Sequence, residues 1–333
     1  MSHRTVLTIG TFDGVHHGHA ALVERAAAIA RDQGGLEVVA LVFDPHPMTT
    51  LNPAMVPARL STFAQRERWL KAAGATRVDR LAPDAATLGL DAEAFIRLKI
   101  DRYAPAAFVE GPDFRFGKAR RGDVLMLDDL GRKMGFGLEV VLPVSVALSD
   151  HRIVPARSTV TRELIREGRV RDAAMVLGRP YELEGEVVPG DRRGRTIGFP
   201  TANIKTDQLL PADGVYAALA VLPDGRELPA AINIGERPTF AAAARTTEAH
   251  IILSGAGATP APAALWSPLP GVPEYHWPIR LKLVAWLRDQ ARFESLDLLK
   301  AQLARDCRRA VEFAAAADEL AEPIAPVPEE SPA

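Results

Sequence analysis

Short apolar runs alternate with helical patterns from Thr5 to about Leu142. Five of these runs predict strands, at Val6–Ile9, Leu36–Phe43, Arg77–Leu81, Ala106–Val109 and Leu138–Leu142. The intervening patterns predict helices, at Ala20–Arg31, Phe63–Ala73, Ala92–Tyr103 and Val124–Met134. This alternation predicts an α/β domain whose doubly wound parallel sheet is covered by helices on both faces. Ligands of such sheets bind beyond the carboxyl ends of the strands.

The pattern changes after two short predicted helices, at about Thr161–Glu167 and Val170–Leu177. Strand-like runs then follow without a helix between them, at Tyr181–Val188, Gly214–Leu222, Leu228–Ile234, Thr247–Leu253 and Ile279–Trp286. Several short strands separated by glycine and proline predict a small antiparallel β-barrel. Ser295 is the expected N-cap of a C-terminal helix that extends to about Ala316.

The predicted boundary between the two domains lies near Gly178-Arg179-Pro180. It assigns residues 1–178 to the α/β domain and residues 179–318 to the barrel with its helix. The remaining residues, 319–333, are rich in proline and glutamate and are predicted to be a disordered tail.

Composition narrows the classes of function. The 40 basic and 42 acidic residues nearly balance, which argues against a nucleic acid or an anionic membrane as a partner. Cys307 is the only cysteine, which excludes an internal disulfide framework and a cysteine-rich zinc site. We see no secretory signal pattern and no apolar run of membrane-spanning length. We therefore expect a cytoplasmic protein.

The most informative motif is Gly10–His19, which reads G-T-F-D-G-V-H-H-G-H between a predicted strand and a predicted helix. Histidines at i and i+3 of an opening helix, here His16 and His19, share one face. That face lies beside the unpaired N–H groups and the positive dipole end of the helix, which together bind anions. The alternative is a tight turn in which both histidines only cap or pack.

This motif resembles the H-x-G-H nucleotidyltransferases, specifically the bacterial FMN adenylyltransferase module with its pattern G-x-F-D-G-V-H-x-G-H. Phe43–Pro47 (F-D-P-H-P) and Gly111–Gly117 (G-P-D-F-R-F-G) are similar to two further family motifs. The resemblance implies that the FMN phosphate attacks the α-phosphate of ATP while His16 and His19 stabilise the triphosphate. It also implies a flavin contact at His46. The implied nucleotide contacts are Gly10, Phe12, Asp13, Gly14, Asp113, Ser158, Thr159 and Arg162.

Two of these residues have an ordinary alternative, because His46 in a proline turn can be structural and Asp113 can close a turn on its own backbone. One stretch also departs from the family. Where the family has S-S-T-x-[IV]-R, this chain has R-S-T-V-T-R, with Arg157 in place of the first serine and Thr161 in place of the aliphatic residue. An added cation is compatible with a bound triphosphate, whereas loss of the aliphatic anchor would loosen the loop.

A second motif, Gly190–Asn203, reads G-D-R-R-G-R-T-I-G-F-P-T-A-N. Composition alone describes an exposed basic loop, although backbone N–H groups of such loops can also cradle phosphates. Its G-x-P-T-A-N core resembles the riboflavin kinase signature. The resemblance implies that Thr201 and Asn203 hold Mg²⁺ with ATP, through oxygen ligands that suit magnesium, and that Gly190 and Arg195 lie near the phosphates.

Thr247–Ile251 resembles the kinase family's E-x-H strand, which makes Glu248 the implied catalytic base for the ribityl 5′-hydroxyl of riboflavin. A glutamate on a half-buried strand is otherwise a solvent-facing residue. Asn233–Phe240 is similar to the family's N-I-G-x-R-P-T-F turn, expected beside the flavin. Ser254–Pro278 departs from the family as a long proline-rich segment, predicted to be a mobile loop. Its aromatic residues, Trp266, Tyr275 and Trp277, are expected to pack onto the barrel rather than stack on the flavin.

Together the motifs cover roughly residues 5–315 and resemble the bacterial bifunctional riboflavin kinase/FMN adenylyltransferase (FAD synthetase) family. The resemblance implies conversion of riboflavin to FMN and then to FAD, with two molecules of ATP and with Mg²⁺. One alternative is a riboflavin kinase whose first domain is degenerate, as Arg157 and Thr161 suggest. Another is a flavin-sensing regulator without catalysis, which the presence of Glu248 and the lack of a basic recognition helix disfavour.

Overall fold

The computed structural model describes residues 4–236, 245–253, 269 and 271–317. The chain divides into two compact units, each described by itself below. Among the helices of the described residues, none is long and apolar enough to cross a membrane. The predicted tail and Trp266 lie outside the described residues, as does the second half of the expected Asn233–Phe240 turn.

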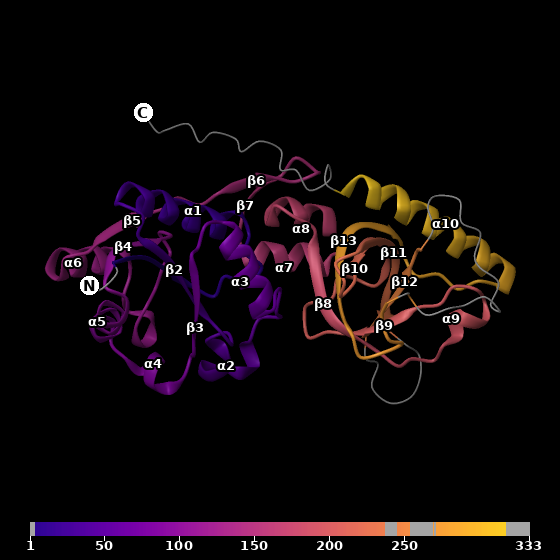
Figure 1. Ribbon diagram of the computed structural model, residues 1–333, viewed down its shortest axis with the longest axis horizontal. Coiled ribbons are helices and arrows are strands. Elements are labelled where there is room, and N and C mark those ends of the chain that lie inside the picture. Colours follow the sequence, from indigo (N-terminus) through magenta and orange to yellow (C-terminus); the bar gives the residue numbers. More distant parts are fainter. Residues whose placement is uncertain (1–3, 237–244, 254–268, 270, 318–333) are drawn as a thin grey trace. The chain divides into compact units, whose positions relative to one another are not determined.

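The first unit contains the predicted parallel sheet, with strand order β3-β2-β1-β4-β5 (Figure 1). Its strands are β1 (Thr5–Gly10), β2 (Glu37–Phe43), β3 (Arg77–Leu81), β4 (Pro105–Glu110) and β5 (Gly137–Val140). Its helices are α1 (His17–Asp32), α2 (Met48–Leu51), α3 (Phe63–Ala72), α4 (Ala85–Gly89), α5 (Ala92–Tyr103) and α6 (Val124–Met134), with single 3₁₀ turns at Pro53–Met55 and Lys118–Arg120. The predicted doubly wound fold is confirmed.

Two hydrophobic cores cover the two faces of this sheet. Val6 of β1 packs with Val23 of α1 and Leu70 of α3. The next residue, Leu7, packs with Ile96 of α5 and Leu127 of α6 on the other face. Because successive strand residues point to opposite faces, both must be apolar in a sheet covered on both sides.

The second unit is built on a closed barrel with strand order β10-β11-β12-β9-β8-β13, in which the neighbouring strands are antiparallel. Its strands are β8 (Tyr181–Val188), β9 (Ala202–Lys205), β10 (Gly214–Val221), β11 (Glu227–Glu236), β12 (Arg245–Ile251) and β13 (Pro278–Arg288). Its helices are α7 (Ser158–Arg166), α8 (Val170–Leu177), α9 (Arg193–Thr196) and α10 (Leu296–Ala315). The predicted barrel is confirmed, but β9 was missed by the sequence analysis.

The helix α10 begins where predicted, because the Ser295 side chain accepts a hydrogen bond from Leu298 N at 3.2 Å. It packs against β10, β11 and β13. Arg288 of β13 donates to Asp306 of α10 at 2.7 Å, and the Asp306 side chain is only 1 % exposed. A buried, multiply bonded ion pair of this kind fixes the helix against the strand.

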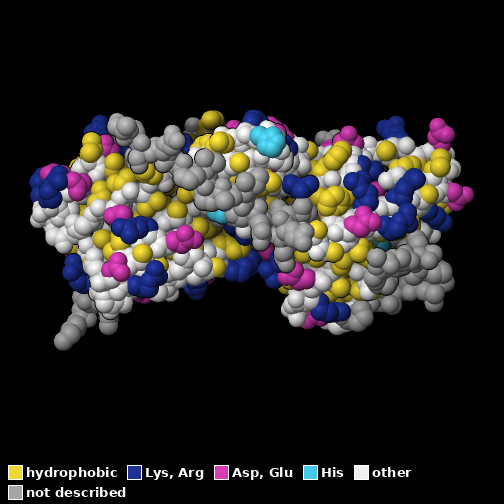
Figure 2. All heavy atoms as spheres, turned by 90° about the horizontal axis from the view of Figure 1, so that it is seen from above, with side chains coloured by type: hydrophobic (Ala, Val, Ile, Leu, Met, Phe, Trp, Pro, Cys, Tyr) yellow, Lys and Arg dark blue, Asp and Glu magenta, His cyan; other side chains and the backbone are white. Residues whose placement is uncertain are grey.

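The first unit comprises residues 1–145 and 154–158, and the second comprises residues 146–153 and the described residues from Thr159 on. The second unit thus includes α8, which packs against β8 and β13. The domain boundary expected at residues 178–179 stays a prediction. Two short strands that the sequence analysis did not predict, β6 (Ser145–Ala147) and β7 (Ile153–Pro155), form a separate two-stranded sheet. On the face drawn in Figure 2, basic and acidic side chains are mixed, as the balanced composition predicts.

Candidate active sites

The turn after β1 has an unusual backbone. Phe12, Gly14 and Val15 have φ values of 49°, 85° and 41°. The left-handed region is unfavourable for residues other than glycine, so packing must hold Phe12 and Val15, which are 1 % and 3 % exposed. A Cβ on Gly10 would lie 3.1 Å from the Phe12 ring. The turn is therefore shaped by buried apolar side chains and carries the chain to the start of α1.

His16 and His19 lie together at this helix terminus. The His16 side chain is the N-cap of α1, with Nδ1 accepting a hydrogen bond from His19 N at 3.3 Å. The two rings stack with centroids 3.7 Å apart, and Phe12 meets His19 edge-on at 5.1 Å. Because Nδ1 of His16 accepts, a neutral ring carries its proton on Nε2 and can donate it to a ligand. The shared face is confirmed, although His16 caps the helix rather than lying inside it.

Asp13 anchors a distant loop. Its carboxylate accepts hydrogen bonds from Leu60 N at 3.0 Å and from Ser61 N and Oγ at 2.9 Å. Ser61 Oγ in turn accepts from Gly14 N at 2.8 Å. The sequence analysis proposed Asp13 as a nucleotide contact and missed Leu60 and Ser61. The observed hydrogen bonds give Asp13 a structural role, and the nucleotide contact stays a prediction.

We expect Asp13→Ala to destabilise the first unit, because it leaves the buried N–H groups of Leu60 and Ser61 without their acceptor. Each buried donor left unsatisfied costs about 1–3 kcal/mol, which corresponds to a fall of roughly 2–12 °C in Tm for a unit of this size. Thermal unfolding measures the shift. Asp113→Ala is the matched control, since the Asp113 side chain is 75 % exposed. An unchanged Tm for Asp13→Ala would contradict the anchoring role.

The turn after β2 joins the same region. His46 Nδ1 accepts from Met48 N at 3.1 Å. Arg66 of α3, which the sequence analysis missed, is 4 % exposed and donates to the carbonyls of Thr11 and Phe43 at 2.9 and 3.0 Å. It also forms an ion pair with Asp44. His46 and Arg66 both line a pocket of about 150 Å³ at the carboxyl ends of β1 and β2.

The stretch that departs from the family motif, Arg157–Arg162, is held by contacts of its first two residues. Ser158 Oγ donates to Asp13 O at 2.7 Å. Arg157 Nη2 lies 3.6 Å from a carboxylate oxygen of Asp113, so the added cation is paired with a predicted nucleotide contact. Thr161 is fully buried, and it therefore occupies the interior position expected of the aliphatic anchor. Thr159 and Arg162 fall in the second unit, and their nucleotide contacts stay predictions.

In the barrel, three polar residues of adjacent strands stand in one row. Asn203 of β9 pairs with Glu248 of β12, and Glu248 pairs with Asn233 of β11. Residues paired directly across antiparallel strands point to the same face. A Cβ on Gly190 would lie 1.9 Å from Nδ2 of Asn203, so only glycine leaves room for this side chain. The motifs Gly190–Asn203 and Thr247–Ile251 are thus brought together at the pairing of β9 with β12.

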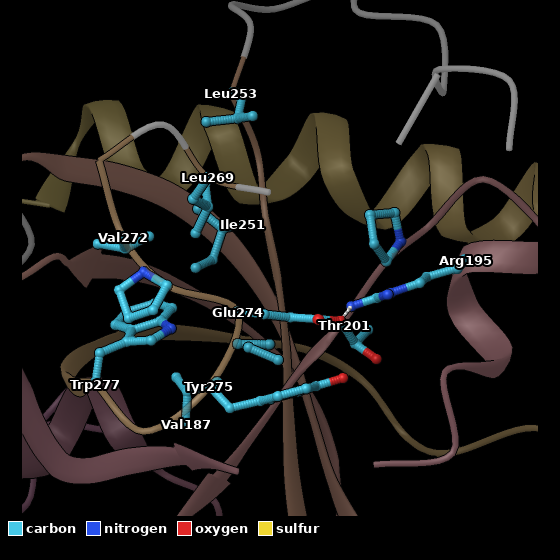
Figure 3. A pocket seen from close by; sticks show the side chains of 14 residues that line it. Val187, Arg195, Thr201, Ile251, Leu253, Leu269, Val272, Glu274, Tyr275 and Trp277 are labelled. Carbon is cyan, nitrogen blue, oxygen red and sulfur yellow. Dashed lines mark hydrogen bonds and ion pairs between the residues drawn. The ribbon is translucent and has the colours of Figure 1, made fainter. Parts of the chain in front are cut away.

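Two pockets lie in this part of the barrel, and Asn233 and Glu248 of the row line the larger one. The larger pocket, of about 520 Å³, lies between the barrel and α10. Its lining includes Thr201, Val215, Asn233, Glu248, His250, Arg288, Gln290, Phe293, Leu303 and Cys307. The smaller pocket, of about 100 Å³, is lined by residues including Val187, Arg195, Thr201, Ala249, Ile251, Val272, Tyr275 and Trp277 (Figure 3). Thr201 contributes to both.

Figure 3 shows Arg195 and Thr201 at one end of the smaller pocket and Trp277 at the other. Arg195 is paired with Glu274, and Arg192 Nε donates to the Tyr275 hydroxyl at 2.9 Å. The carboxylate of Glu274 thus holds Arg195, whose phosphate contact stays a prediction. Trp277 is 4 % exposed, as expected for an aromatic residue packed onto the barrel, and its Nε1 has no hydrogen-bond partner among the described residues.

Comparisons with known proteins match this two-part organisation. Residues 1–154 match the family model of FAD synthetase, and residues 177–314 match that of riboflavin kinase. The chain is 35 % identical over 310 residues to the bifunctional riboflavin kinase/FMN adenylyltransferase of Escherichia coli K12, covering 92 % of each protein. It is 30 % identical to the protein of the same name from Haemophilus influenzae, covering 92 % of this chain and 93 % of that one.

A solved structure is also similar over nearly the whole chain. It comes from Streptococcus pneumoniae and is described as a macrolide-efflux protein. The TM-score is 0.77 at 28 % sequence identity, over 92 % of this chain and 93 % of that one. The likeness thus extends over both units.

Proposed function

This chain belongs to the family of bifunctional riboflavin kinases/FMN adenylyltransferases, and from that premise we propose which residues carry each reaction. The protein uses ATP both to phosphorylate riboflavin to FMN and to adenylylate FMN to FAD. We assign phosphorylation to the barrel unit and adenylylation to the α/β unit. Both reactions are proposed to need Mg²⁺ and to take place in the cytoplasm.

The kinase assignment rests on one observation, that Thr201 lines both barrel pockets while Glu248 lines only the larger one. We place riboflavin in the larger pocket and the adenosine part of ATP in the smaller one. The triphosphate then passes Thr201, where the pockets adjoin. Trp277 Nε1 is buried and finds no hydrogen-bond partner in the part of the chain that the structure describes, which supports it as a donor to the nucleotide base.

In this arrangement the Glu248 carboxylate takes the proton of the ribityl 5′-hydroxyl. The hydroxyl oxygen forms a bond to the γ-phosphorus of ATP, and the bond between that phosphorus and the β,γ-bridging oxygen breaks to release ADP. Such transfer depends mainly on positioning and charge stabilisation. The pairing of Glu248 with Asn203 and Asn233 supports this role, because it fixes the base in a row of polar residues.

The residues at the proposed metal site fit magnesium. Thr201 offers a hydroxyl oxygen on an exposed residue, and Asn203 offers an amide oxygen beside the open backbone of Gly190. Magnesium takes few protein ligands in such sites and completes its shell with phosphate oxygens and water. Bound with ATP, it would neutralise charge on the phosphates during transfer.

We expect Gly190→Ala to raise the Mg²⁺ concentration needed for FMN formation, because the new methyl group displaces Asn203. Loss of a group that orients a metal ligand typically weakens metal binding about 10–100-fold. Initial rates of FMN formation, followed by chromatography over a Mg²⁺ titration, measure the effect. Adenylylation of supplied FMN should stay unchanged in the same variant. The matched control is Gly89→Ala, where a Cβ would meet no atom within 4 Å. An unaltered Mg²⁺ requirement would refute the site.

For adenylylation, we propose that the triphosphate of the second ATP binds at the N-terminus of α1, with His16 and His19 as donors. The FMN phosphate attacks the α-phosphorus in line, and the bond to the bridging oxygen breaks to release pyrophosphate. The reaction needs no covalent intermediate with the protein. The stacking of the two rings and the capping contact support this role, since both fix the donors before substrate binds. The pocket lined by His46 is the proposed flavin site.

A further inference from the structure

His250 lines the larger pocket, but neither reaction as derived above uses it. It stands two residues after Glu248 on β12, and alternate strand residues point to the same face. Its Nδ1 lies 2.8 Å from the carbonyl oxygen of Pro200. A carbonyl oxygen can only accept, so Nδ1 carries the proton of the neutral ring. The Phe199 ring meets the imidazole edge-on, with centroids 5.5 Å apart.

We propose that His250 is a positioning residue for the kinase reaction, which fixes Thr201 by holding the carbonyl of Pro200. The proposal rests on the function proposed above for Thr201. The Pro200 carbonyl belongs to the peptide that joins Pro200 to Thr201. Fixing that peptide plane fixes the backbone conformation of Thr201. The backbone conformation in turn sets the direction in which the side-chain hydroxyl points.

Among the described residues, two backbone contacts flank this peptide. Upstream, Phe199 N donates to Gly194 O at 2.8 Å. Downstream, β9 is only four residues long and begins at Ala202, where it pairs with Ala249. The hydrogen bond from His250 restrains the peptide between these two backbone contacts. Burial lowers the pKa of His250, which favours the neutral ring that this geometry needs.

Two substitutions distinguish a hydrogen-bonding role from simple packing. The side-chain nitrogen of Asn stands two bonds from Cβ, as Nδ1 of His does, whereas that of Gln stands one bond further out. H250N therefore keeps a donor for Pro200, and H250Q does not. We expect H250Q to lower kcat/KM for ATP in FMN formation about 10–100-fold, the usual range for groups that orient ligands. H250N should stay close to the wild-type protein.

Binding supplies a readout that does not depend on turnover. Titration calorimetry of the full chain with ADP in the presence of MgCl₂ should show weaker binding for H250Q and near-normal binding for H250N. Riboflavin binding, followed by fluorescence quenching, should change in neither variant. FMN adenylylation serves as the control for folding. Equal losses in H250N and H250Q, or normal ADP binding by H250Q, would overturn the proposal.

A third variant separates this proposal from the one it rests on. If Thr201 binds the metal–nucleotide complex, Thr201→Ala weakens ADP binding by itself, and adding H250Q to it produces little further loss. Coupled residues of this kind show non-additive effects. Additive losses would refute the positioning role of His250 alone. Normal ADP binding by Thr201→Ala would instead refute the proposed function of Thr201.

Discussion

Glu248→Gln is expected to abolish FMN formation from riboflavin and to leave FAD formation from supplied FMN intact. General base catalysis contributes typically about 10²–10⁴-fold, and an amide cannot take a proton from the ribityl hydroxyl. Gln has nearly the same shape as Glu, so the row that Glu248 forms with Asn203 and Asn233 should persist. The selective loss of one reaction follows from the placement of Glu248 in the barrel unit.

The measurement is chromatography of two separate incubations with ATP and Mg²⁺, one with riboflavin and one with FMN. Glu227→Gln is a suitable control, because Glu227 lies on the neighbouring strand β11 and forms only a partly exposed pair with Lys282. Such pairs contribute about 0–1 kcal/mol, so this control should keep both reactions. Full kinase activity in Glu248→Gln would remove Glu248 as the base. Loss of both reactions would indicate that the substitution acts through folding.

The sequence predicted the architecture well where local pattern determines it. Apolar positions such as Val6 and Leu7 are buried on opposite faces of one strand, so a continuous apolar run was a reliable sign of a doubly covered sheet. β9 was missed because its first two residues, Ala202 and Asn203, end a motif that was interpreted for its chemistry, and because its four residues carry no long apolar run. The strands β6 and β7, of three residues each, are too short to give a periodic signal.

The sequence named candidate residues for both sites, but it did not reveal the residues that hold them in place. Ser61 lies 48 positions from Asp13, and Arg66 lies 55 positions from Thr11, whose carbonyl it binds. No local pattern encodes such contacts, because they exist only once the sheet has formed. Capping by the histidines was considered only as the alternative to anion binding, since Ser, Thr, Asp and Asn are the usual caps, yet His16 is the N-cap of α1. The place of α8 in the second unit depends on its packing against β8 and β13, which its own sequence does not specify.

His19→Ala is expected to reduce FAD formation from FMN about 10²–10³-fold, the usual effect of removing one preorganised donor of this type, while FMN formation persists. His19 is a cleaner choice than His16 for a structural reason. His16 also caps α1, and loss of an N-cap side chain destabilises a helix by about 0.5–2 kcal/mol. In His19→Ala the backbone N–H of residue 19 still donates to His16, so the cap survives.

His17→Ala provides the comparison within the same motif. His17 is the first residue of α1 and lies two residues before His19, and residues one or two apart on a helix do not share a face. Its removal should therefore leave FAD formation far less affected than the removal of His19. Equal losses in the two variants would indicate that the turn, rather than the His19 ring, matters for catalysis. If His19→Ala reduced FMN and FAD formation together, the two reactions could not be assigned to independent sites. A selective loss of FAD would show that the α/β unit transfers the adenylyl group through a donor fixed by the stacking of two imidazole rings.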